Sequence, residues 1–206
     1  MLVRHRTTLW CIAGISLAVV GACFLYVRAV GPLPGELRFE SWRVDGGYPA
    51  EWNRPLTFVT YLGDTWVALV SVLLLAAVVT EELGWRAALL VLAAAGGPVI
   101  AEGLSQVLGP TSQEYGGAAG VNLGPADNFP SGHATYAVSV FGLTSWMAFD
   151  HGHRVLAGAL ALPVILMGPA LGILGNHYPA DVIGGYALGL AWLITVLLVG
   201  RRYVRG

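Results

Sequence analysis

The chain has 206 residues, of which 56% are hydrophobic and 11% are charged, and its formal net charge is −1. Soluble domains of ordinary composition carry about 25% charged residues, so this composition argues against a soluble fold. The charge also gives no reason to expect nucleic acid as a partner.

The apolar residues fall into six blocks of about 20 residues, the length that spans a hydrocarbon core of roughly 30 Å. In chain order the blocks cover residues 9–30, 56–80, 87–108, 131–149, 155–174 and 180–200. We therefore expect an all-α fold, with residues 1–206 forming one integral membrane domain built as a six-transmembrane-helix bundle. The first block is longer than a signal-peptide core and lacks a small-residue cleavage site, which predicts a retained helix.

Glycines within these blocks predict local features of the bundle. Gly96-Gly97-Pro98 predicts a kink in the third helix. The pairs Gly168/Gly172 and Gly185/Gly189 have the spacing that lets helix backbones approach closely. The same spacing is also compatible with a homo-oligomer held together by helix packing.

The arginines are distributed unevenly between the two sides that six crossings create. One side has Arg4, Arg6, Arg86, Arg154, Arg201, Arg202 and Arg205. The loop 31–55 on the other side mixes three arginines with four acidic residues. The positive-inside rule then places both termini in the cytoplasm of a multi-pass protein of the inner (plasma) membrane. The loops 31–55, 109–130 and 175–179 face outward, so we expect the active site on the extracytoplasmic side.

The outward loop 175–179 precedes the last block with the motif His177-x-x-x-Asp181. Pro179 suits the first turn of a helix, where its missing N–H costs little. Asp181 one turn later can accept the Nδ1 proton of His177 and leave Nε2 free, which is the arrangement of a nucleophile and its orienting carboxylate. A capped helix with a structurally bonded histidine is the alternative.

The fourth block opens with Pro130-Ser131-Gly132-His133. Ser131 is a favourable N-cap residue, and Gly132 allows a ligand to approach the backbone. The free N–H groups of a helix start favour a phosphate oxygen. His133 at this position could protonate a leaving alkoxide as a general acid. A simple turn before a membrane helix is the alternative.

Pro-Ser-Gly-His followed by His-x-x-x-Asp resembles the type 2 phosphatidic acid phosphatase superfamily, over roughly residues 57–200. The resemblance implies a six-helix membrane phosphatase that forms a phosphohistidine. It implies that His177 attacks phosphorus, His133 protonates the leaving group and Asp181 supports the nucleophile. Ser131 and Gly132 would hold phosphate oxygens, and neither a cofactor nor a metal would be required. The expected partner is a lipid substrate in the bilayer.

Two motifs of that family are incomplete in this sequence. The family pattern Lys-x6-Arg-Pro has its nearest match from Glu102 to Pro110, where only the proline remains. The pattern Ser-Arg-x5-His-x3-Asp has Ala170 and Leu171 where serine and arginine are usual. Three cationic ligands and one hydroxyl are therefore missing. A bidentate arginine is the usual ligand of a phosphomonoester, so their loss bears directly on the substrate.

Three explanations fit this pattern. An arginine of the loop 31–55 (Arg38, Arg43 or Arg54) could supply the charge from elsewhere. The substrate could be a phosphodiester, which implies a lipid head-group transferase or a phospholipase C-like enzyme. The site could also be degenerate, which implies a non-catalytic lipid-binding or assembly protein. The first explanation fits a lipid phosphatase or phosphotransferase acting on a lipid or polyprenyl phosphate.

Further polar residues lie near the expected site. Glu102 and Gln106 are one helical turn apart and would share a face, either as part of a head-group pocket or as a buried hydrogen-bonded pair. Asn176 precedes His177, and we include it with Glu102 and Gln106 among the expected substrate-binding residues. Asp64 is expected to have a structural role.

Overall fold

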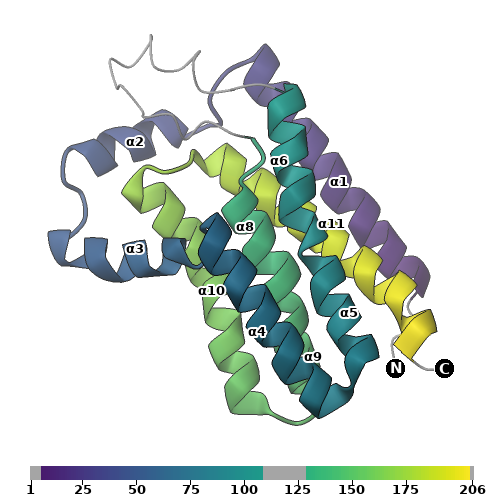
Figure 1. Ribbon diagram of the computed structural model, residues 1–206. Coiled ribbons are helices and arrows are strands. Elements are labelled where there is room, and N and C mark those ends of the chain that lie inside the picture. The colour runs from purple at the N-terminus through teal and green to yellow at the C-terminus, as the bar shows by residue number, and fades with distance from the viewer. Residues whose placement is uncertain (1–5, 109–128, 205–206) are drawn as a thin grey trace.

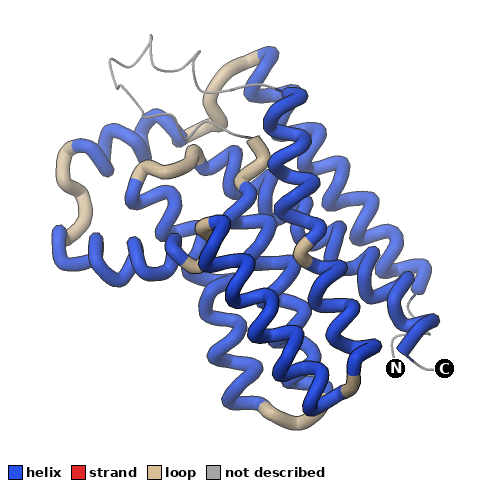
Figure 2. Tube along the Cα trace, viewed as in Figure 1, coloured by secondary structure: helices blue, strands red, loops and turns tan. Residues whose placement is uncertain are grey.

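The computed structural model describes residues 6–108 and 129–204, and helices account for all the regular structure in those two ranges. Figure 1 shows a bundle of long helices with a smaller pair beside it, and Figure 2 shows that short loops join the helices. The expected all-α fold is thereby confirmed.

The first and last helices pack along one another. Helix α1 (Arg6–Ala29) lies against α11 (Pro179–Val204), and the start of α1 lies near the end of α11 (Figure 1). The start of α1 and the end of α11 therefore lie at the same end of the bundle. Which side of the membrane that is stays a prediction.

Within the described residues, five helical segments are long and apolar enough to cross a membrane. They are Arg6–Ala29, Thr65–Leu83, Trp85–Leu108, Arg154–Leu174 and Pro179–Gly200. The other block expected to span, 131–149, forms α8 (Gly132–Tyr136), the π-helical segment η3 (Ala137–Phe141) and α9 (Gly142–Asp150). Each of these is short, so the six-span count stays a prediction.

The second block differs from its expected form. Instead of one helix over 56–80, the chain forms α3 (Asn53–Tyr61) and α4 (Thr65–Leu83). The residue before α4, Asp64, has the extended backbone of an N-cap (φ −64°, ψ 138°), and Gly63 precedes it. The largely apolar composition of the block concealed this turn, whose position decides where the Asp64 side chain lies.

The third block breaks where its glycines predicted. Helix α5 (Trp85–Ala94) ends and α6 (Gly96–Leu108) begins around Ala95. A Cβ on Gly96 or Gly97 would lie 3.1 or 3.0 Å from the Trp192 side chain. The absence of side chains at both positions therefore makes room for the Trp192 indole of α11.

The loop 31–55 forms α2 (Glu36–Val44) and η2 (Ala50–Trp52), and α2 and α3 project beside the bundle (Figure 1). A buried carboxylate ties α2 to the last helix: Glu36 Oε1 accepts the Ala180 N–H at 2.9 Å, and Glu36 Oε2 accepts the Leu33 N–H at 2.7 Å. Both N–H groups thus gain a charged acceptor, which is stronger than a neutral one.

Two buried clusters form the centre of the bundle. The larger lies where α4, α5, η3, α9 and α11 meet, and the smaller joins α8 and η3 to α10 (Arg154–Leu174) and α11. A Cβ on Gly185 would lie 2.5 Å from the Ser131 carbonyl oxygen, and one on Gly189 would lie 2.8 Å from the Thr135 carbonyl oxygen. The close helix contact predicted for this glycine pair is confirmed, and it holds α11 against α8.

Candidate active site

A cavity of about 530 Å³ opens where α3, α6, α8 and the loop between α10 and α11 meet. Its volume falls within the roughly 300–1,000 Å³ that is usual for small-molecule sites. It is lined by Thr57, Thr60, Tyr61, Asp64, Glu102, Pro130, Gly132, His133, Leu171, Leu174, Asn176 and His177. The two histidines singled out in the sequence therefore line one cavity.

His177 lies in the short loop that reverses the chain between two long helices. Helix α10 ends at Gly175, whose φ of 73° is a left-handed conformation that glycine adopts without strain. Asp181, in the first turn of α11, is 1% exposed, and its Oδ2 lies 3.7 Å from His177 Nδ1. That distance exceeds a hydrogen bond, so Nδ1 has no bonded partner among the described residues.

His133 lies in the first turn of α8, which Ser131 caps by accepting the Ala134 N–H at 3.3 Å. The Nε2 atom of His133 lies 3.2 Å from Asp64 Oδ1. Gly63 packs flat against the imidazole, since a Cβ there would lie 2.3 Å from His133 Cδ2. The turn between α3 and α4 thus fixes the position of this ring.

Backbone contacts bring the two histidine motifs together. The Ser131 N–H donates to the Asp181 carbonyl oxygen at 3.0 Å, which links the start of α8 to the start of α11. The rings of His133 and His177 consequently lie with their centroids 6.2 Å apart. Each imidazole has a carboxylate beside it, Asp64 for the first and Asp181 for the second.

A sequence model of the PAP2 superfamily matches residues 65–205. The chain belongs to the PAP2 superfamily. It is also similar to the crystal structure of the first transmembrane PAP2-type phosphatidylglycerolphosphate phosphatase from Bacillus subtilis, with a TM-score of 0.71 and 19% identity over 98% of each chain. At that identity the likeness shows the fold. Comparison with curated proteins gave no match.

The matched region contains both histidine motifs, while α1, α2, α3 and Asp64 precede it. The wall of this cavity that is formed by Thr57 to Asp64 therefore lies outside the region that the PAP2 model matches. The family match supports membership of a lipid phosphatase family.

The residues that we expected to bind substrate occupy different places. Glu102, Gly132 and Asn176 line the cavity. Gln106 does not line it, and its Nε2 donates to Glu102 Oε1 at 3.1 Å. Ser131 is fully buried with its hydroxyl engaged in capping, and it too is outside the lining. The substrate-binding roles of all five stay predictions.

Asp64, for which the sequence predicts a structural role, has a side chain that is 49% exposed, lines the cavity and contacts His133. It stands at the N-cap position of α4 but makes no capping hydrogen bond. The Gly63-Asp64 pair before an apolar run is a turn and helix-start signal that could have placed it at a helix end.

The charged residues in the described lining of this PAP2 cavity are acidic. Its described lining includes two carboxylates, Asp64 and Glu102, and contains no arginine or lysine. Leu171, six residues before His177, lines the wall where the resemblance led us to expect arginine. Between residues 6 and 108 and between 129 and 204, no group of three or more metal-binding side chains is arranged to hold a metal ion.

One guanidinium lies behind the loop that carries His177. A Cβ on Gly175 would lie 2.6 Å from Arg43 Nη1, so the Arg43 side chain packs against that glycine. Glu40 Oε2 accepts from Arg43 Nε at 3.0 Å and from Arg43 Nη2 at 2.8 Å. Arg43 is thus the loop 31–55 arginine in contact with the site's backbone, but it does not line the cavity.

Proposed function

We propose that this PAP2 protein is a membrane phosphatase or phosphotransferase that acts on a lipid or polyprenyl phosphate through a phosphohistidine at His177. The observation that carries the proposal is the pair of imidazoles that face one cavity, each beside a carboxylate. The family match is its second support.

The spacing of the rings suits a phosphoryl group between them. A nucleophile must come within about 3–3.5 Å of the reacting atom, and a proton donor within about 3 Å of the oxygen it protonates. Rings whose centroids are 6.2 Å apart can flank one phosphoryl group. Asp181 would need to approach His177 Nδ1 by about 0.8 Å to form a hydrogen bond of ordinary length. Such bonds are often long before substrate binds.

The proposed reaction has two steps. First, His177 Nε2 attacks phosphorus, the bond to the alkoxide breaks, and His133 gives a proton to the departing oxygen. Asp64 beside His133 stabilises the protonated imidazole that this step requires. Second, water or an acceptor alcohol gives its proton to His133 and attacks the phosphohistidine, which releases phosphate or a new phosphate ester.

The test offers purified protein in detergent a series of substrates: phosphatidate, phosphatidylglycerophosphate, and polyprenyl phosphate and diphosphate. We expect phosphate release by the wild type and loss of at least about 10³-fold in His177→Ala. His133→Ala is expected to lose about 10²- to 10⁴-fold. His153→Ala is the matched control, since His153 precedes α10 and lies outside the cavity lining. Equal phosphate release by wild type and His177→Ala would sink this mechanism, and no release by either protein from any of these substrates would favour a non-catalytic lipid-binding protein.

The acidic lining favours a second candidate, a phosphodiester-directed head-group transferase or phospholipase C-like enzyme. Asp64 and Glu102 would repel the two charges of a phosphomonoester. They would repel a phosphodiester less, and would attract a cationic head group. The direction in which Glu102→Gln changes kcat/KM separates the candidates. The substitution should raise kcat/KM for a phosphomonoester and lower it for a diester with a cationic head group. If no diester shows head-group release or exchange, the second candidate is excluded.

A further inference from the structure

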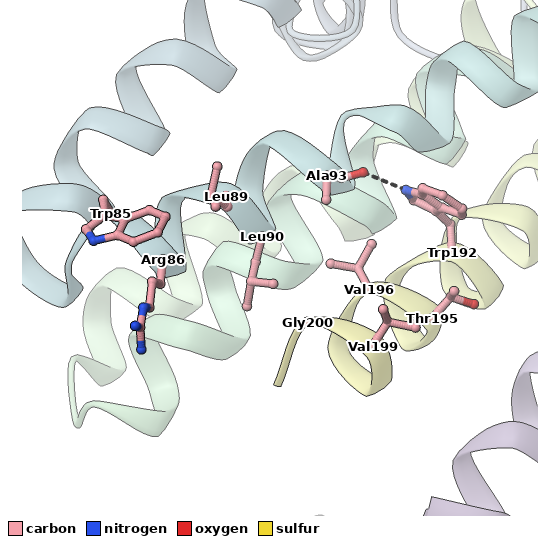
Figure 3. Close-up of a pocket in the computed structure, with 10 residues that line it drawn as sticks. All are labelled: Trp85, Arg86, Leu89, Leu90, Ala93, Trp192, Thr195, Val196, Val199 and Gly200. Carbon is pink, nitrogen blue, oxygen red and sulfur yellow. Dashed lines mark hydrogen bonds between the residues drawn. The ribbon is translucent and has the colours of Figure 1, made fainter. Parts of the chain in front are cut away.

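A second cavity, of about 630 Å³, lies between α5 and α11. Figure 3 shows its two walls, with side chains from α5 facing side chains from α11. Apart from Arg86 and Thr195 its walls are apolar; the lining is Trp85, Arg86, Leu89, Leu90, Ala93, Trp192, Thr195, Val196, Val199 and Gly200. We call this cavity the α5–α11 groove.

The two ends of the groove differ in polarity. At one end the Trp192 indole N–H donates to the Ala93 carbonyl oxygen at 2.9 Å, which satisfies a carbonyl at the end of α5 (Figure 3). At the other end Arg86 lies at the start of α5, with its guanidinium carbon 5.7 Å from the centre of the Trp85 ring. In the described ranges 6–108 and 129–204, no carboxylate forms an ion pair with Arg86.

The Arg86 end of the groove lies far from the histidine cavity. Asp64 precedes α4 and Arg86 follows it, so the 19-residue helix separates them by about 28 Å. Both walls belong to segments apolar enough to cross a membrane, Trp85–Leu108 and Pro179–Gly200. A tryptophan and an arginine at the end of such a segment are typical of the level of the lipid head groups.

We propose that the α5–α11 groove binds one acyl chain of an anionic phospholipid, whose phosphate Arg86 contacts at the membrane surface opposite the histidine cavity. The apolar walls suit the chain, and an arginine that no carboxylate pairs with suits the phosphate. Glu81 and Glu82 precede α5 but do not line the groove.

The size of the groove favours a chain over a helix from a second copy. From Trp85 to Ala93 the groove extends about 12 Å along α5. Helices α5 and α11 contact each other, so a helix about 10 Å across would have to lie over the groove and not between its walls. A narrow acyl chain can enter without separating α5 from α11.

The test is native mass spectrometry of the purified full-length protein after exposure to equal amounts of phosphatidylglycerol and phosphatidylcholine with identical acyl chains. We expect the wild type to retain one phosphatidylglycerol in preference. Arg86→Gln should weaken its retention about tenfold, because a charge-assisted contact to phosphate is lost. Val199→Trp should weaken it by filling the groove from a half-exposed position that accepts a larger side chain.

Two matched variants control for charge and bulk. Arg154→Gln removes an arginine from the start of α10, and Leu73→Trp adds bulk to an exposed position of α4, with neither residue lining the groove. Both should retain lipid like the wild type, as should His177→Ala. Unchanged retention in Arg86→Gln and Val199→Trp would overturn the proposal. Equal retention of both lipids, loss of binding in His177→Ala, or a dimer that only Val199→Trp disrupts would also overturn it.

Discussion

Replacing Gly63 by alanine tests whether His133 must keep its place. A Cβ at Gly63 would lie 2.3 Å from Cδ2, 2.8 Å from Cγ and 3.1 Å from Cβ of His133, whereas ordinary contacts begin at 3.4 Å. The imidazole or the turn must therefore shift by about 1.1 Å, judged from the shortest of those contacts. Gly63 is not among the described glycines with positive φ, so the effect of the methyl group is steric.

A displacement of about 1 Å at a catalytic group can cost about 10²-fold in rate. We expect kcat/KM for phosphate release from the best lipid substrate to fall about 100-fold in Gly63→Ala, equivalent to about 2.7 kcal/mol of transition-state stabilisation. The matched control is Gly103→Ala, next to Glu102 on α6, where an added Cβ meets no atom within 4 Å. Wild-type kcat/KM in a folded Gly63→Ala protein would refute the assigned role of the His133 position.

Three further variants test other parts of the structure. Asp181→Asn should lower kcat by roughly 10³- to 10⁴-fold through loss of the carboxylate that orients His177, while thermal unfolding shows whether the buried amide is accommodated. Gly185→Ala should lower stability by about 1–3 kcal/mol, because its Cβ would meet the Ser131 carbonyl oxygen at 2.5 Å; an unchanged Tm, as expected for Gly158→Ala, would contradict this. Burial raises the pKa of Glu36 above its ordinary value of 4.5, so the folded state holds more protons and stability should fall as pH rises from 4.5 through that raised pKa. Glu36→Gln should flatten this fall in Tm measured from about pH 4 to pH 8.

Apolar block length predicted most of the fold, because a segment of about 20 apolar residues has few alternatives to a membrane helix. The same criterion concealed the turn at Gly63-Asp64, since one polar residue barely changes the composition of the block. It also missed the π-helical segment Ala137–Phe141. Glycine positions predicted the break at Ala95 and the close contact of α11 with α8 because both follow from a missing side chain.

The sequence motifs predicted the two histidines as site residues because each motif is local: each histidine lies at or just before a helix start and has neighbours at fixed spacing. The contact between His133 and Asp64 could not be predicted in this way. The two residues are 69 positions apart, and their contact depends on where α3 ends. The same holds for Arg43, whose contact with Gly175 requires α2 to fold back beside the bundle. Residues that act across helices need the tertiary structure.

The position of Arg43 limits what it can do for a phosphate. Two of its five N–H donors are bonded to Glu40, a buried carboxylate whose charge offsets its own. Its side chain packs against Gly175 before His177, and the described cavity lining has two carboxylates and no guanidinium. In such a site a substrate carrying a single negative charge, or one balanced by its own cation, is repelled less than a dianion. The phosphomonoester and phosphodiester candidates are therefore separated by electrostatics at Asp64 and Glu102, while the histidine chemistry is common to both.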